Sequence, residues 1–242
     1  REKYKKLPKG RKYEKKDGMP DEEIPIAMYN HGWIINYAAM LDDVDHAFGT
    51  LLDAIDELGI KEETYVIFTS DNGGGFRGNA PLKAGKGSLY EGGIRMPSFV
   101  RGPGVEVGSY SKVPVVQWDF LPTFYDLAGG TEPLPEELDG GSIRSVFEKG
   151  NEGRVKRRVR DLIFHFPWHT GVAESVIRSG NYKLRKDLDS LEIELFDVER
   201  DLEENHDLAK KLPKIVKKLD RRRSAYCLLY TSDAADEERG VG

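Results

Sequence analysis

Apolar residues recur at steps of three and four between residues 36 and 58, which predicts one long amphipathic helix. The apolar positions of this segment are Tyr37, Met40, Leu41, Val44, Phe48, Leu51, Leu52, Ile55 and Leu58. Most acidic residues of the segment fall between them, on the face that we expect to meet solvent. His46 belongs to this helix, so a partly exposed histidine is expected there rather than a ligand. Gly59 is a residue that often ends a helix.

A short run rich in β-branched and aromatic residues, Thr64–Ser70, follows this helix and ends in a cluster of turn residues. Such a run is typical of a strand that is buried on both faces, as in a parallel sheet. Further strands are predicted at 97–101 and 113–117, and helices at 120–127 and 142–148. A long helix followed by a buried strand is half of a β-α-β unit, so this part predicts an α/β domain.

The pattern changes after about residue 155, where short strands with close turns are predicted in series. They cover residues 161–166, 172–178, 182–185 and 193–198, with a hairpin turn at 179–181. A lysine-rich helix is expected at about 208–220. The fold class expected is therefore α/β: part of a mainly parallel sheet flanked by helices, with a small C-terminal antiparallel sheet plus helix subdomain.

Composition narrows the classes of function. The 242 residues include 37 basic and 42 acidic side chains, a net charge of −5, which argues against nucleic-acid binding through bulk positive charge. No apolar run is long enough to cross a bilayer, so no membrane span is expected. The one cysteine, Cys227, excludes an internal disulfide framework and a site built from several thiolates. Nine of the first sixteen residues are basic, and we interpret them as a solvated surface segment.

Asp71 and Asn72 directly follow the predicted strand Thr64–Ser70. Ligands of open α/β sheets lie at the carboxyl ends of the strands. A carboxylate and an amide side by side are hard oxygen donors, suited to Ca²⁺ or Mg²⁺. The alternative is a simple turn, because Asn-Gly is a strong turn signal, and Asp-Asn-Gly by itself favours that alternative.

Lys86 lies between Gly85 and Gly87 in a glycine-rich loop, where the backbone can come close to a ligand. Its ammonium group suits a tetrahedral oxyanion. The glycine spacing differs from that of a nucleotide-binding loop, and no Ser or Thr directly follows the lysine. Gly-Lys-Gly alone does not identify a site, and Lys83 is equally compatible with an ordinary surface charge.

Residues 69–95, TSDNGGGFRGNAPLKAGKGSLYEGGIR, closely resemble the signature of the sulfatase family, which belongs to the alkaline-phosphatase-like superfamily. The resemblance continues through residues 118–123 and 138–140, and through 164–167, 177–184 and 195–209. It covers the chain nearly continuously from about Tyr37 to Ala209. The resemblance implies a partial alkaline-phosphatase-like sheet and a hydrolase of sulfuric esters.

The resemblance also assigns roles to residues. Asp71 and Asn72 match two of the four side chains that hold the family's divalent cation, which is usually Ca²⁺, with Mg²⁺ as the alternative. Lys86 matches the lysine that binds the sulfate group. Glu91 is expected to hold the loop rather than to take part in catalysis. A cation and a lysine together neutralise charge on the sulfuryl oxygens, as hydrolysis of a sulfate ester requires.

The family's nucleophile is a formylglycine made from a cysteine or serine in a Cys/Ser-x-Pro/Ala-x-Arg motif. That motif does not occur in the 242 residues. We therefore expect a C-terminal fragment of a sulfatase, with the nucleophile in a missing N-terminal part, and a chain that is inactive alone. His31 lacks the His-Pro context of the family's catalytic histidine and is expected in a loop.

The aromatic segment Phe164–His169 borders the predicted antiparallel subdomain. His165 is a candidate for substrate binding, because in the family this subdomain borders the substrate cleft. A packed strand with a satisfied histidine is an equally good interpretation. Trp168 is a candidate for packing against a sugar ring.

Two alternatives to a sulfatase remain open. One is a phosphodiesterase or phosphoryl transferase of the same superfamily, for which an Asp-His pair after the strand would be expected instead of Asp71-Asn72. The other is a non-catalytic sulfatase-like domain that binds a partner. The expected partner is a sulfated small molecule or glycan, not nucleic acid, and family habit predicts a periplasmic or secreted protein.

Four regions are predicted. Residues 1–35 form a basic surface segment and lead-in, 36–155 the C-terminal part of the sulfatase catalytic domain, and 156–226 the C-terminal subdomain. Residues 227–242 form a tail that begins as one translation frame of the transposon adapter used in sequencing libraries. We expect the tail to be an assembly artefact; without it the chain has 36 basic and 38 acidic residues and no cysteine.

Overall fold

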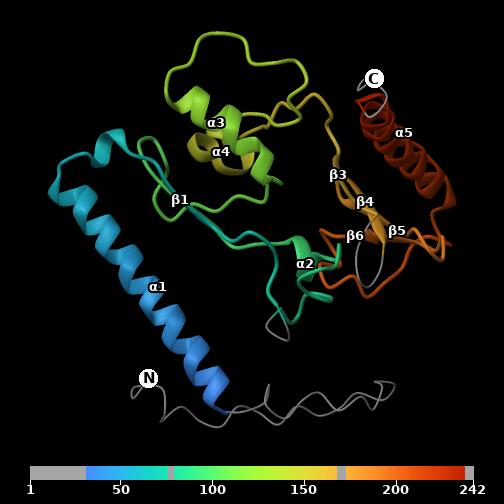
Figure 1. Ribbon diagram of the computed structural model, residues 1–242, viewed down its shortest axis with the longest axis horizontal. Helices are drawn as coiled ribbons and strands as arrows, with labels where there is room; N and C mark the ends of the chain where they lie inside the picture. Colours follow the sequence, from blue (N-terminus) through green and yellow to red (C-terminus); the bar gives the residue numbers. More distant parts are fainter. Residues whose placement is uncertain (1–30, 76–78, 168–172, 238–242) are drawn as a thin grey trace. The chain divides into compact units, whose positions relative to one another are not determined.

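The computed structural model describes residues 31–75, 79–167 and 173–237 (Figure 1). The chain divides into two compact units, and the boundary in the sequence lies between Tyr65 and Val66. The first unit consists of helix α1 (His31–Glu57) and the short 3-10 helix η3 (Lys61–Glu63). The helix predicted at 36–58 is thus confirmed, and it begins earlier, so that His31 is helical rather than in a loop. The basic segment at residues 1–16 lies outside the described residues.

Two glycines of the first unit have opposite roles. Gly59 ends α1 with a φ of +69°, and the amides of Gly59 and Ile60 donate back to the carbonyls of Asp56 and Ile55 at 3.1 and 3.3 Å. A positive φ favours glycine, so Gly59 is needed for this helix end. Gly49 lies inside the helix, and a Cβ built on it would meet no atom of the described residues within 4 Å.

Alanine at these two positions should therefore change stability in opposite directions. Gly49→Ala should stabilise α1 by roughly 0.5–1 kcal/mol, since alanine loses less backbone entropy in a helix. Gly59→Ala should destabilise it by about 1 kcal/mol, because an L-residue is strained at that φ. Thermal melting followed by helical circular dichroism would measure both. Equal shifts of the same sign would contradict the assigned helix end.

The second unit contains a two-stranded sheet formed by β1 (Val66–Thr69) and β2 (Ser98–Arg101). Both strands lie where the sequence predicted them. The sequence predicted that β1 is buried on both faces, as in a parallel sheet. Its one partner among the described residues is β2, and the pairing is antiparallel, with Val66 opposite Arg101. The side chains of β1 are accordingly half-buried rather than buried on both faces.

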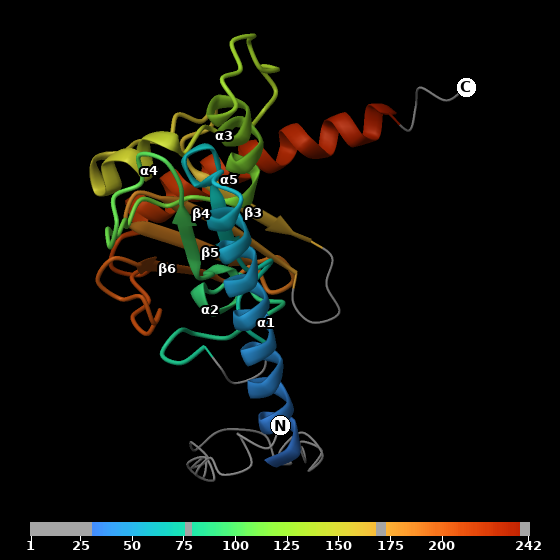
Figure 2. The same cartoon turned by 90° about the vertical axis from the view of Figure 1, so that its left-hand side faces the viewer.

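The antiparallel subdomain expected after residue 155 is confirmed as a four-stranded sheet in the order β3-β4-β5-β6. Its strands are β3 (Leu162–Phe166), β4 (Glu174–Ser179), β5 (Tyr182–Asp187) and β6 (Ile193–Asp197). Gly180, with a φ of +59°, makes the predicted hairpin turn between β4 and β5. Helix α5 (Pro213–Glu237) packs on one face of this sheet (Figures 1 and 2).

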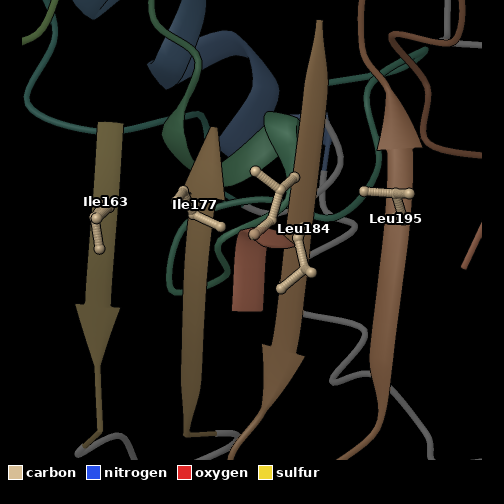
Figure 3. Packing of buried hydrophobic residues seen from close by; sticks show 5 residues of the cluster. Ile163, Ile177, Leu184 and Leu195 are labelled. Atoms are coloured by element: carbon tan, nitrogen blue, oxygen red, sulfur yellow. The ribbon is translucent and has the colours of Figure 1, made fainter. Parts of the chain in front are cut away.

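One apolar residue from each strand builds the core beneath α5. Ile163, Ile177, Leu184 and Leu195 are directly paired across the sheet, and Leu219 of α5 completes the buried cluster. Figure 3 shows the four strand residues side by side in one row. Because side chains alternate along a strand, the residues between them belong to the other face. That other face carries Glu174, Lys183, Arg185 and Glu194.

Helix α5 differs from the helix predicted at 208–220 at both ends. Leu208–Leu212 form turns instead, and the helix begins at Pro213, a residue that lacks the N–H and is favoured at a first helical position. The helix continues beyond Asp220, where Arg223 is buried and Tyr226 packs against the apolar core cluster of the sheet. The interpretation of residues 227–242 as an artefact stays a prediction.

Helix α2 (Glu91–Ile94) lies in the connection between β1 and β2. The connection between the two sheets contains η4 (Gln117–Asp119), α3 (Phe120–Leu127), α4 (Arg144–Lys149) and η5 (Gly150–Glu152). The prediction for α3 is confirmed, and α4 corresponds to the helix predicted at 142–148. The strand predicted at 113–117 is wrong. Pro114 has no N–H, and the amides of Val113 and Val116 donate to the side chains of Ser111 and Asp119. None of the described helices is long and apolar enough to cross a membrane.

Candidate sulfate and metal site

Asp71 and Asn72 lie at the carboxyl end of β1, as predicted, with Ser70 between the strand and Asp71. The Asp71 Oδ1 atom accepts hydrogen bonds from the Asn72 amide at 2.9 Å and from the Ser70 hydroxyl at 3.3 Å. The Asn72 Nδ2 atom donates to the Gly73 carbonyl at 2.8 Å. These bonds fix both side chains and leave Asp71 Oδ2 and Asn72 Oδ1 without a hydrogen bond among the described residues.

The donor set fits part of a calcium site. Asp71 is exposed, and each of the two side chains keeps one hard oxygen available, the ligand type that Ca²⁺ and Mg²⁺ prefer. Ca²⁺ takes about six to eight oxygens, so this pair can supply only a share of the coordination shell. Within the described ranges no group of three or more His, Cys, Asp and Glu side chains lies together as a metal cluster.

Closely packed glycines bring the loop of Lys86 against the loop of Asp71. The Gly73 amide donates to the Gly93 carbonyl at 2.8 Å, and the Lys86 amide donates to the Gly74 carbonyl at 2.9 Å. A Cβ on Gly85 would lie 2.7 Å from the Gly74 oxygen, too close for any side chain. Here glycine lets backbone approach backbone, and the contact holds Lys86 beside the end of β1.

Lys83 and Lys86 have different surroundings. The Lys83 ammonium lies 4.2 Å from the centre of the Tyr90 ring and 3.6 Å from Glu194, so its charge is already paired. Lys86 is exposed, and its ammonium has no ion pair or hydrogen bond with any residue that the structure describes. Lys86 is therefore the lysine that is available to an anion.

Glu91, at the start of α2, is buried in a cluster of charges. The Lys183 ammonium, itself fully buried, lies 3.0 Å from Glu91 Oε1 and 2.9 Å from Glu204 Oε1. The Glu91 amide donates to Glu204 Oε2 at 2.7 Å, and Arg95 donates to Glu91 Oε2 at 3.0 Å. Glu91 thus holds the loop, as the sequence analysis expected.

The two carboxyls of this cluster have pKa values that move in opposite directions. Burial raises the pKa of Glu91, but attraction to Lys183 and the bonds from Lys183 and Arg95 outweigh it, and the pKa ends below the ordinary value. For Glu204, the effect of burial is larger than the attraction to Lys183, so the pKa of this carboxyl is raised.

A second charged cluster surrounds Arg185, which lies two residues after Lys183 on β5. Arg185 donates to Glu174 at 3.0 Å and to Glu194 at 2.9 Å, and its guanidinium lies 4.5 Å from the Tyr90 ring. Tyr90 donates its hydroxyl to Glu194. Burial and this carboxylate raise the pKa of Tyr90, so the phenol stays protonated and keeps donating. The segment that carries Lys86 is therefore bound to the sheet on both sides of residue 90.

His165 lies on β3, on the sheet face that α5 covers, because it pairs with Ser175 and feels the charge of Arg223. Lys183 and Arg185 point to the opposite face, so the structure does not bring His165 together with Asp71, Asn72 and Lys86. Its role in substrate binding stays a prediction. Trp168 and His169 lie outside the described residues.

The position of His165 predicts a pH dependence of stability. Burial and the positive charge of Arg223 lower its pKa below the ordinary 6.5. The unfolded chain therefore takes up a proton first as the pH falls through 6.5, and the folded state loses stability there. Urea unfolding at pH 7.5 and 5.5 should show a smaller difference in His165→Gln than in the wild type. An identical difference in both proteins would contradict the placement.

Sequence reasoning missed Lys183, Arg185, Glu174 and Glu204 as residues that support the site. The signal was present in the strand predicted at 182–185, where charged residues alternate with apolar ones. An alternating charged face usually meets solvent, and only the fold shows that this one is buried.

Two family models match the chain. One is described as Sulfatase and covers residues 8–130; the other is described as N-sulphoglucosamine sulphohydrolase, C-terminal, and covers residues 85–225. A sulfatase of Formosa agariphila is 35% identical over 202 residues, which is 74% of this chain and 36% of that protein. Human arylsulfatase A is 36% identical over 154 residues, 59% of this chain and 29% of that protein. The chain spans about a third of the length of these curated relatives.

Solved structures agree with these matches. Ps i-CgsB in complex with k-i-k-neocarrahexaose superposes with a TM-score of 0.71 and 30% identity, over 79% of this chain and 42% of that chain. BT4656 in complex with its substrate D-glucosamine-2-N,6-O-disulfate superposes with a TM-score of 0.69 and 27% identity, over 86% of this chain and 42% of that chain.

Proposed function

Because the chain belongs to the sulfatase family, we propose that it forms part of an enzyme that hydrolyses sulfate esters. The observation that supports this most is the position of Lys86. Its ammonium is free among the described residues, while its backbone is bonded to the loop that carries Asp71 and Asn72. The neighbouring Lys83, by contrast, is occupied by Tyr90 and Glu194.

In this proposal Lys86 binds the sulfuryl oxygens of the ester, and its charge stabilises the negative charge that gathers there during hydrolysis. Asp71 and Asn72 would hold the divalent cation, Ca²⁺ with Mg²⁺ as the alternative. When bound, that cation supplies further positive charge to the same oxygens. Glu91 takes no part in the chemistry, because its carboxylate is occupied by Lys183 and Arg95.

We further propose that the nucleophile is a formylglycine in sequence outside these 242 residues, since no Cys/Ser-x-Pro/Ala-x-Arg motif occurs in them. The chain alone should then be inactive. A sulfated glycan is the substrate class that we favour, since BT4656 is described in complex with D-glucosamine-2-N,6-O-disulfate. An exported enzyme would suit such a substrate.

Turnover assays test this proposal. The 242-residue chain and the full-length gene product would be assayed with an aryl sulfate, a sulfated glucosamine and a phosphate diester. We expect no turnover by the chain, and hydrolysis of the sulfate esters by the full-length product. In that product Lys86→Gln should lower sulfate turnover at least about 100-fold, and Lys83→Gln much less. Turnover by the isolated chain, or faster hydrolysis of the phosphate diester, would contradict the proposal.

A further inference from the structure

Two carboxylates on the C-terminal half of the chain accept backbone amides from the segment that follows Lys86. The Leu89 amide donates to Glu174 Oε2 at 2.9 Å, and the Glu91 amide donates to Glu204 Oε2 at 2.7 Å. The other oxygen of each carboxylate faces a cation of β5. Glu174 Oε1 pairs with Arg185 at 3.0 Å, and Glu204 Oε1 pairs with Lys183 at 2.9 Å.

The two bridges have the same spacing on both sides. Lys183 and Arg185 are two residues apart on β5, so their side chains share one face at about 6.6–6.8 Å along the strand. The bound amides, of residues 89 and 91, are also two residues apart, and Tyr90 between them is extended, with φ −70° and ψ 164°. The extended segment therefore has the same two-residue repeat as the strand. Each cation pairs with one carboxylate, and each carboxylate accepts one amide of the segment.

This match fixes the register of the segment. Lys183 and Glu204 are fully buried, and Glu91 and Glu174 nearly so. A shift of the segment by one residue would place Tyr90 opposite a buried carboxylate and leave buried charges without partners. Unpaired buried charges are strongly destabilising, so only one register is favourable.

We infer that Lys183 and Arg185 are positioning residues for Lys86. Leu89, the first residue held by the bridges, follows Lys86 by three positions, and the Lys86 amide is bonded to Gly74. The segment is thus fixed at both ends around the lysine. Neither cation contacts the ester, and each acts through Glu204 or Glu174. The effect on sulfate binding rests on the proposed function, whereas the fixing of the segment does not.

The test compares Lys183→Met with Lys186→Met in the full-length gene product. Lys186 is a matched control because it lies on the same strand, points to the opposite face and also forms an ion pair, with Asp220 at 3.6 Å. Hydrogen exchange would be measured at the amides of residues 89–91. Acylation of Lys86 would be measured with increasing inorganic sulfate, which protects the lysine when bound.

Lys183→Met should speed exchange at the Leu89 and Glu91 amides about tenfold or more. It should also raise the sulfate concentration for half-protection of Lys86 by about tenfold, and Lys186→Met should change neither. If Lys183→Met does not fold, the double variant Lys183→Met, Glu204→Gln replaces the pair by neutral groups and carries the same expectation. Wild-type exchange at residues 89–91 in a folded variant would overturn the inference. A third outcome separates the two claims: Lys183→Met speeds exchange, but sulfate does not protect Lys86 even in the wild type. That outcome would support the positioning role and refute the proposed function.

Discussion

Asp119→Ala is expected to destabilise the second unit by about 3–5 kcal/mol, the range for breaking a buried ion pair from one side. Asp119 is fully buried, and its carboxylate accepts four hydrogen bonds. Arg157 donates two of them, at 2.8 and 2.6 Å, and the amides of Val116 and Gly141 donate the others, at 2.9 and 3.1 Å. Alanine would leave the buried Arg157 guanidinium with only the Pro114 carbonyl as an acceptor, and it would remove the acceptor of the buried Gly141 amide and the half-buried Val116 amide.

Asp126→Ala is the matched control. Asp126 is also paired with an arginine, Arg144 at 3.3 Å, but the two side chains are 40% and 45% exposed. Pairs of this kind contribute about 1 kcal/mol or less. Urea unfolding at neutral pH would measure both variants against the wild type. If Asp119→Ala were no more destabilising than Asp126→Ala, the structural role assigned to the buried pair would be incorrect.

Gly93→Ala is expected to cost about 1–3 kcal/mol, as overpacking in a tight contact does. A Cβ on Gly93 would overlap the carbonyl oxygen of Ser88 and lie 2.5 Å from that of Gly85. Both neighbours are backbone atoms, so the loop of residues 85–88 would have to move away. That loop carries Lys86, so the protection of Lys86 by sulfate should weaken together with stability.

The matched control for Gly93→Ala is Gly75→Ala. Among the residues that the structure describes, no atom lies within 4 Å of a Cβ built on Gly75, so this variant should unfold at nearly the same urea concentration as the wild type. The same acylation experiment should show unchanged protection of Lys86. Equal losses in the two variants would show that backbone crowding at residue 93 is not what positions the loop.

The spacing of apolar residues was sufficient to predict most helices and strands, because residues close in the sequence determine these elements. The steps of three and four in α1 and α3, and the alternation in β4 and β5, are visible in the sequence and persist in the fold. The failures were local conflicts that periodicity does not weigh. Pro114 removed a donor from an apparently good strand, and Pro213 began α5 five residues later than the apolar stripe suggested.

The candidate site could be predicted only in part. Asp71, Asn72 and Lys86 became candidates through the resemblance of residues 69–95 to the sulfatase signature, because by themselves they indicate only a turn and a glycine-rich loop. Their support could not, because it joins distant residues: Glu91 with Lys183 across 92 positions, and Leu89 with Glu174 across 85. No local pattern distinguishes a lysine that is fully buried between two carboxylates from one in water.

Protection of Lys86 from acylation by sulfate tests the central claim most directly. In the full-length gene product, inorganic sulfate should slow the labelling of Lys86 in a saturable way, and Ca²⁺ should enhance the effect through Asp71 and Asn72. Labelling of Lys83 should not respond, since Tyr90 and Glu194 already occupy its charge. The account predicts this difference between two lysines three residues apart; equal labelling of both at every sulfate concentration would contradict it.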